Sequence, residues 1–143
     1  MGNSDLTVEG RTILKGFCNW CAIEKIYDDS FSFENENVSR VIYDSSRKIL
    51  TLEIEIEKYP KNPPKKWKEF DGVMLVVDFF IRTDAVDNLK GKKSSIISFS
   101  ISDISNNAEA FSTYLLNINC EEGIINGDFF EARIQNIKPI ILN

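Results

Sequence analysis

Histidine is absent from this 143-residue sequence, and no run of apolar residues is long. Without histidine, the usual general base at neutral pH is missing. No apolar run approaches the roughly 18 residues that a membrane-spanning helix needs. The net charge of −5 argues against nucleic acid and anionic membranes as partners, because positive surfaces bind phosphates. These absences favour a protein that is not an enzyme and that binds neither nucleic acid nor membrane.

Cysteine is scarce, and its pattern is weak. Cys18 and Cys21 have the spacing of a redox pair or of half a zinc site. They also fit two small buried residues on one helical turn, and we favour this interpretation because a second CxxC pair and histidine ligands are lacking. We therefore predict no metal and no cofactor. The odd cysteine count, with Cys120, suits a reducing compartment. Residues 1–10 have no features of a secretion signal, so we expect a cytoplasmic protein.

Length and composition predict a single domain over residues 1–143, in which residues 1–10 are loose. The apolar fraction of 43% is sufficient for a real core. Ten phenylalanines are many for a chain of this size, and such rings can fill the space between a sheet and its cover.

The most regular part of the chain is the segment 49–80. Between Ile49 and Glu57 apolar and polar residues alternate, which predicts a strand with one buried face and one acidic, exposed face. Val73–Val77 is a continuous apolar run, which is typical of a central strand covered on both faces. A loop rich in lysine and proline, residues 58–68, joins the two strands.

The remaining pattern predicts one helix and several short strands. Apolar residues recur at helical spacing up to Tyr27, with Asn19 as the N-cap and Trp20 as an anchor on the sheet. Further strands are expected at 38–43, 97–101, 111–119 and 128–137, with a polar connection at 82–93 and a stop at Pro139. The predicted fold class is α+β: an antiparallel β-meander of about six strands, with an N-terminal helix packed on one face.

The surface chemistry available to a partner is mainly acidic. Through Glu57 the chain has 11 acidic against 6 basic residues, and from Asp103 to Asn136 it has 6 against 1. The acids on the exposed face of strand 49–57 have two interpretations, a solvated face or an acidic patch for a basic protein. The candidate partner-binding residues are Asp28, Asp29, Glu53, Glu55, Glu121 and Glu122.

Trp67 lies among five lysines in the 58–68 loop. Basic residues interleaved with an aromatic can stack a nucleic-acid base, but the acidic chain makes a structural role the better interpretation. We therefore expect Trp67 to be largely buried, with its neighbouring lysines exposed, because a fully exposed indole gains nothing from water. Trp20 and Trp67 are thus the predicted structural residues.

One family likeness is visible in the same region. Trp20 leading a short helix, the strand ILTLEIEIEKYP, the loop NPPKKW at 62–67 and the strand VMLVVDF together resemble the immunity protein 50 family. The likeness covers roughly residues 19–102, and residues 103–143 add no family feature.

This resemblance implies a bacterial cytoplasmic protein, encoded beside a polymorphic or contact-dependent toxin, that binds and blocks one cognate toxin domain. A basic toxin domain, such as a nuclease, would complement the acidic chain. The alternative is a β domain that binds a small ligand in a cavity lined by aromatic residues such as Phe79, Phe99 and Phe130.

Overall fold

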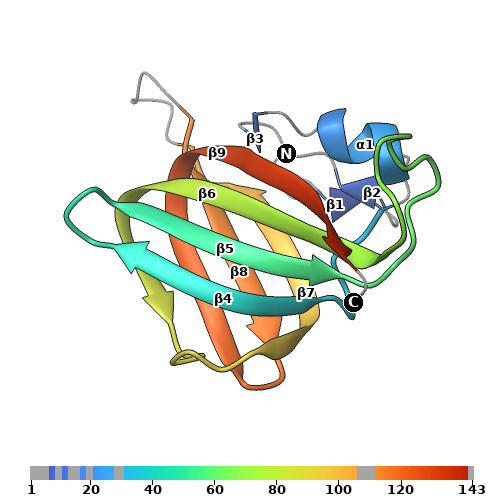
Figure 1. Cartoon of the computed structure of the whole chain (residues 1–143). Helices are drawn as coiled ribbons and strands as arrows, with labels where there is room; N and C mark the ends of the chain where they lie inside the picture. Colours follow the sequence, from blue (N-terminus) through green and yellow to red (C-terminus); the bar gives the residue numbers. More distant parts are fainter. Residues whose placement is uncertain are drawn as a thin grey trace.

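Six antiparallel strands close into a barrel around the core (Figure 1). The computed structural model describes residues 7–8, 11–12, 17–18, 21–27, 31–105 and 112–141. The barrel strands are β4 (Asn37–Asp44), β5 (Ile49–Ile56), β6 (Phe70–Asp87), β7 (Ser94–Asp103), β8 (Tyr114–Cys120) and β9 (Gly123–Ile141). Their order is β9-β6-β5-β4-β7-β8, and β8 pairs back with β9 to complete the ring.

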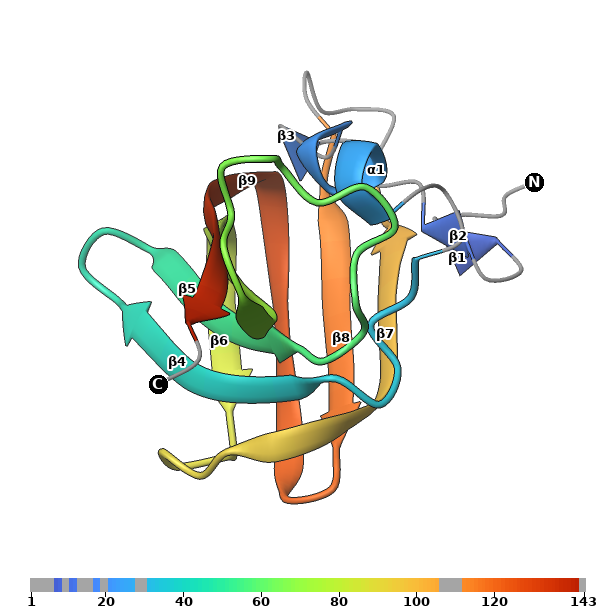
Figure 2. The ribbon, with the colours of Figure 1, turned by 45° about the vertical axis from the view of Figure 1, so that its right-hand side comes forward.

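The other elements are short. They are β1 (Thr7–Val8), β2 (Arg11–Thr12), β3 (Phe17–Cys18) and the helix α1 (Cys21–Tyr27). β1 pairs with β2, and β3 adds a parallel partner to β9. Figure 2 shows α1 beside one end of the barrel, next to the loop that joins β5 to β6. In the described part of the chain, no helix has the length and apolar character to cross a membrane.

The predicted α+β meander is therefore corrected to a mostly β, closed barrel. Neighbours in sequence do pair, as expected of a meander, in the runs β4-β5-β6 and β7-β8-β9. What the prediction missed is the pairing of β6 with β9, which brings the two runs together. This contact joins segments far apart in sequence, and a hydrophobic period carries no information about it.

Closure depends on the length of β6 and β9, which have 18 and 19 residues. The segment 82–87, expected to be a polar connection, continues β6 and pairs with β9 through Asp87 and Ile125. Likewise β9 continues through Pro139, which faces Val73 of β6 and no other described strand. Proline is tolerated where a strand is paired on one side only, so it does not end β9. Several register shifts along the β6–β9 ladder accompany the bending of both strands.

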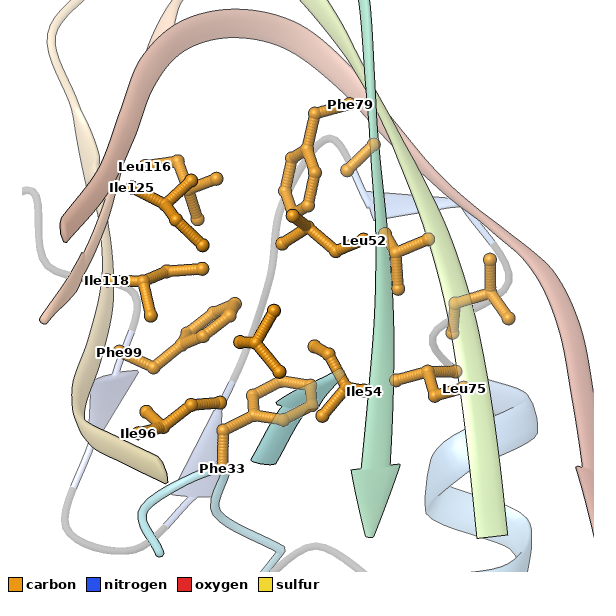
Figure 3. Close-up of a cluster of buried hydrophobic side chains, with 14 of the residues drawn as sticks. Phe33, Leu52, Ile54, Leu75, Phe79, Ile96, Phe99, Leu116, Ile118 and Ile125 are labelled. Atoms are coloured by element: carbon orange, nitrogen blue, oxygen red, sulfur yellow. The ribbon is translucent and has the colours of Figure 1, made fainter. Parts of the chain in front are cut away.

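The barrel is filled by the inward residues of every strand (Figure 3). Along β5 the burial alternates strictly, as the sequence predicts. β4 and β7 pair at only two positions, and the preceding segment extends their contact through Asn35, whose amide donates to the Ile96 carbonyl at 2.8 Å. Phe33 from this segment enters the core, with its ring centroid 4.3 Å from that of Phe99. Phe33 thus fills the core beside the β4–β7 contact, where only two residue pairs join the neighbouring strands.

The strict alternation of β7 would place Ile97 on the same face as Phe99 and Ile101, but Ile97 is 59% exposed, because the β7–β8 register shifts between Ile96 and Ser98 and turns this residue out. The proposed aromatic cavity also fails: Phe79 and Phe99 are buried in the packed core, whereas Phe130 is 45% exposed. The three rings therefore do not line one cavity, and the small-ligand alternative loses its basis.

A buried carboxylate links the segment before β4 to the start of the β5–β6 loop. Glu36 is only 2% exposed, and its Oε1 accepts the Glu57 amide at 2.7 Å. The Lys58 ammonium lies 3.1 Å from its Oε2 and also donates to the Ser32 carbonyl at 2.8 Å. Tyr27 of α1 donates its hydroxyl to the Lys58 carbonyl at 2.8 Å. Burial, and then the charge of Glu36, raise the pKa of Tyr27, so it remains a neutral donor. We call these contacts the Lys58 latch.

Candidate partner-binding surface

The acids of β5 lie on the outer wall of the barrel, and each has a basic neighbour. Glu53 is 3.7 Å from Arg40, its register partner on β4. Glu55 accepts the Lys93 ammonium at 2.7 Å, and its side chain is 28% exposed. The row of like charges expected from the sequence is therefore compensated by cations from neighbouring segments, which removes much of its self-repulsion.

The acids of the β8–β9 turn, Glu121 and Glu122, are exposed. They lie near the β6–β7 loop, which also carries Lys93. The Glu121 amide donates to the Ser95 carbonyl at 3.0 Å, which fixes the turn beside β7. The Glu122 carboxylate is 3.8 Å from the Lys92 ammonium. Lys92 and Lys93 of the β6–β7 loop thus pair with Glu122 and Glu55, one acid from each of two sequence-predicted groups.

The other predicted site residues add less. Asp28, Asp29 and Trp20 lie outside the described residues, as do the side chains of Cys18 and Cys21. Among the residues that are described, no group of three or more acids or cysteines could hold a metal. Burial, and then the charge of Asp87, raise the pKa of Cys120 to about 11. Its thiol is therefore protonated and unreactive at neutral pH.

Beyond Glu55 the wall is hollowed where β5 ends. This depression, the acidic hollow, has a volume of about 400 Å³ and is lined by Glu55, Ile56, Glu57, Asp71 and Ile140. Gly72 shapes it, since φ is 112° there and a Cβ would stand 2.8 Å from the Ile56 carbonyl oxygen. Only glycine lets β6 approach the end of β5 so closely. Three of the five described lining residues are acidic, and none is basic.

A second depression, the Trp67 groove, lies between α1, the β5–β6 loop and β9. It has a volume of about 570 Å³. Its described lining is Ala22, Lys25, Ile26, Asn62, Pro64, Lys66, Trp67, Ile134, Gln135, Asn136 and Ile137. The Asn62 amide donates to the Ile26 carbonyl at 2.9 Å, which ties the loop to the end of the helix. The Trp67 amide donates to the Pro64 carbonyl at 3.0 Å and completes a turn.

Trp67 itself is half-buried, so the prediction of a largely buried side chain is met only in part. Its ring packs edge-on against Phe70, with centroids 5.4 Å apart. The neighbours Lys65, Lys66 and Lys68 are exposed, as expected. One part of the indole therefore stabilises the loop while another part faces the groove.

Sequence reasoning selected Trp67 but missed the groove around it. The missing partners were Lys25 on α1 and the segment 134–137 of β9, which are far from Trp67 in sequence. The stiff Pro63-Pro64 pair was an available signal, since it restricts the loop to few conformations. It does not indicate which elements lie opposite.

This closed barrel presents paired surface charges, an acidic hollow and the Trp67 groove. A family model described as immunity protein 50 matches residues 19–140. The chain belongs to the immunity protein 50 family, and this membership indicates a role in neutralising a toxin. The match extends well beyond residue 102, into β8 and β9, where sequence reasoning had found no family feature. No curated protein and no solved structure matches the chain.

Proposed function

We propose that this protein binds one cognate bacterial toxin domain and blocks it by surface complementarity. The observation that carries the proposal is the family match, which spans every strand of the barrel. Such a role needs a complementary surface and no reaction chemistry of its own. We place the encounter in the cytoplasm, where three cysteines would stay reduced.

The proposed partner is basic, as a nuclease domain with a cleft for phosphates would be. The chain carries a net charge of −5, which would attract such a domain over a distance. The acidic hollow offers a specific contact, because a cation of the toxin could reach Glu57 or Asp71 without displacing Lys93 from Glu55. Glu53, Glu121 and Glu122 would extend this surface, together with Asp28 and Asp29.

Co-expression tests the proposal directly. The family predicts a toxin gene beside this one. The toxin domain found there is expressed from an inducible promoter, with and without this protein, in a sensitive host. We expect growth only when both are present, and we expect the two proteins to co-purify. A toxin domain of similar charge from an unrelated locus is the control, and it should not be neutralised. Failure of rescue, together with no complex in a pull-down, contradicts the proposal.

A further inference from the structure

The Trp67 groove has an apolar lining, of which Ala22, Trp67 and Ile137 are partly exposed and within reach of a partner. Ile26 of α1 and Ile134 of β9, which also line the groove, belong to the buried core, so its apolar floor continues that core towards the surface. Trp67 stands over it half-buried. Tryptophan in a concave, partly desolvated site is the residue type that most often dominates binding energy at interfaces. The volume of about 570 Å³ also falls in the range of ligand-binding pockets, about 300–1,000 Å³.

The walls of the groove are held in place before any partner arrives. Gln135 donates its side-chain amide to the Asp78 carboxylate, which also accepts the Thr51 hydroxyl at 2.6 Å. On the opposite wall, the Asn62 amide fixes the loop to Ile26. A groove with fixed walls loses little conformational entropy on binding, which favours affinity.

The charge of the groove is opposite to that of the protein as a whole. Its charged lining residues are Lys25 from α1 and Lys66 from the loop, both exposed. No acid is among the described residues that line it. A cationic rim around an apolar floor is complementary to an acidic segment that carries an apolar side chain.

We propose that the Trp67 groove receives an acidic segment of the toxin, with an apolar side chain inserted against Trp67 and carboxylates meeting Lys25 and Lys66. The assignment rests on the proposed function, because it takes the toxin as the partner.

The loop itself supplies a matched control. Lys65 and Lys68 are exposed like Lys66 but are outside the groove lining. The test compares the double variant Lys25→Glu/Lys66→Glu with Lys65→Glu/Lys68→Glu, which changes the net charge equally. Affinity for the neighbouring toxin domain is measured by calorimetry. We expect the groove variant to bind at least about tenfold more weakly and the control to stay within about threefold of wild type. If both variants bind equally weakly, the loss of affinity is explained by the change in net charge alone, and the groove assignment is overturned.

Aromatic variants test the apolar contact separately. Tyr59 stacks on Phe70 with centroids 4.9 Å apart, so it shares the packing partner of Trp67 without lining the groove. Trp67→Phe keeps an aromatic ring on Phe70 and should weaken binding about tenfold, whereas Tyr59→Ala should leave it unchanged. Wild-type affinity for Trp67→Phe and for the double lysine variant together would overturn the groove assignment.

The outcomes separate this inference from the proposed function. A wild-type complex that is insensitive to every groove variant rejects the groove and leaves toxin binding intact. Absence of any wild-type complex rejects both. A single-stranded oligonucleotide is the second probe, and its binding to wild type but not to Lys25→Glu/Lys66→Glu would assign the groove to nucleic acid and overturn the proposal. Dimerisation in light scattering that the same variant abolishes would assign it to a second copy and overturn it too.

Discussion

Replacing Lys58 by methionine tests whether the Lys58 latch stabilises the fold. The substitution keeps an apolar chain near Phe31, over whose ring the ammonium lies at 5.6 Å. It removes the charge that faces Glu36 and the donor to the Ser32 carbonyl. Breaking a fully buried ion pair costs about 3–5 kcal/mol. Because the Lys58 side chain is 47% exposed, water can replace part of the interaction, and we expect a loss of about 2–3 kcal/mol.

Urea unfolding followed by tryptophan fluorescence gives the assay. Lys65→Met is the matched control, since Lys65 belongs to the same loop and is exposed. It should change the free energy of unfolding by less than about 0.5 kcal/mol. A double-mutant cycle with Glu36→Gln should show coupling of about 1–2 kcal/mol between the two side chains. If Lys58→Met unfolds at the same urea concentration as Lys65→Met, the latch contributes nothing and the reasoning is refuted.

Three further changes probe other parts of the barrel. Gly72→Ala should lower the free energy of unfolding by about 2–3 kcal/mol in urea titrations, because φ is positive and the new Cβ meets the Ile56 carbonyl; an unchanged midpoint would contradict the strain. Trp67→Ala should cost about 2–3 kcal/mol, less than the roughly 3–5 of a fully buried aromatic, and a loss beyond that range would show deeper burial. Burial raises the pKa of Asp128, but hydrogen bonds from Thr83 and Asp84 lower it by more, to below 3.8. The ionised Asp128 carboxylate therefore stabilises the fold above the unfolded pKa, and this stabilisation is lost as pH falls through the folded pKa. The free energies of unfolding of wild type and Asp128→Ala should accordingly converge below about pH 3.8. A difference between the two proteins that stays constant with pH would refute this.

How far the sequence determines the fold depends on the range of the interaction. The alternation of β5 and the β4–β5 hairpin are local, and both were predicted with boundaries close to those observed. The closing contact between β6 and β9 joins distant segments, and polar residues at 82–87 hid the length of β6. A short helix such as α1 is stabilised by packing more than by propensity. The predicted α+β class therefore gave the helix too large a share of the structure.

In the candidate site, too, features set by local pattern were predicted and features set by distant contacts were not. The outward direction of Glu53 and Glu55 follows from the strand period and was predicted, but both side chains are partly buried. Their pairing with Arg40 and Lys93 depends on strand register and on the path of the β6–β7 loop, which no period encodes. The Trp67 groove depends on three segments brought together by the barrel, so only one of its walls was visible in the sequence.

The pairing of the β5 acids leads to a sharper test of the acidic surface. Reversing both acids, Glu53→Lys/Glu55→Lys, should weaken toxin binding and flatten its salt dependence, since rim charges steer association and desolvated ones fix the complex. The reversal also places like charges beside Arg40 and Lys93, at a cost of about 0.2–1 kcal/mol per pair. Thermal unfolding should confirm that the double variant is still folded.

The reversal changes both the net charge and the local ion pairs, so its effect on binding has two possible sources. A charge swap separates them. Glu55→Lys with Lys93→Glu keeps the local ion pair and the net charge, but it puts an ammonium in place of a carboxylate at the acidic hollow. If the toxin inserts a cation there, the swap should weaken binding without flattening the salt slope, while unfolding like wild type. If the toxin responds only to the overall field, the swap should bind like wild type and only the reversal should change the salt slope. Wild-type affinity and salt slope in both variants would mean that the toxin docks elsewhere, and that the acids of β5 serve the barrel through Arg40 and Lys93.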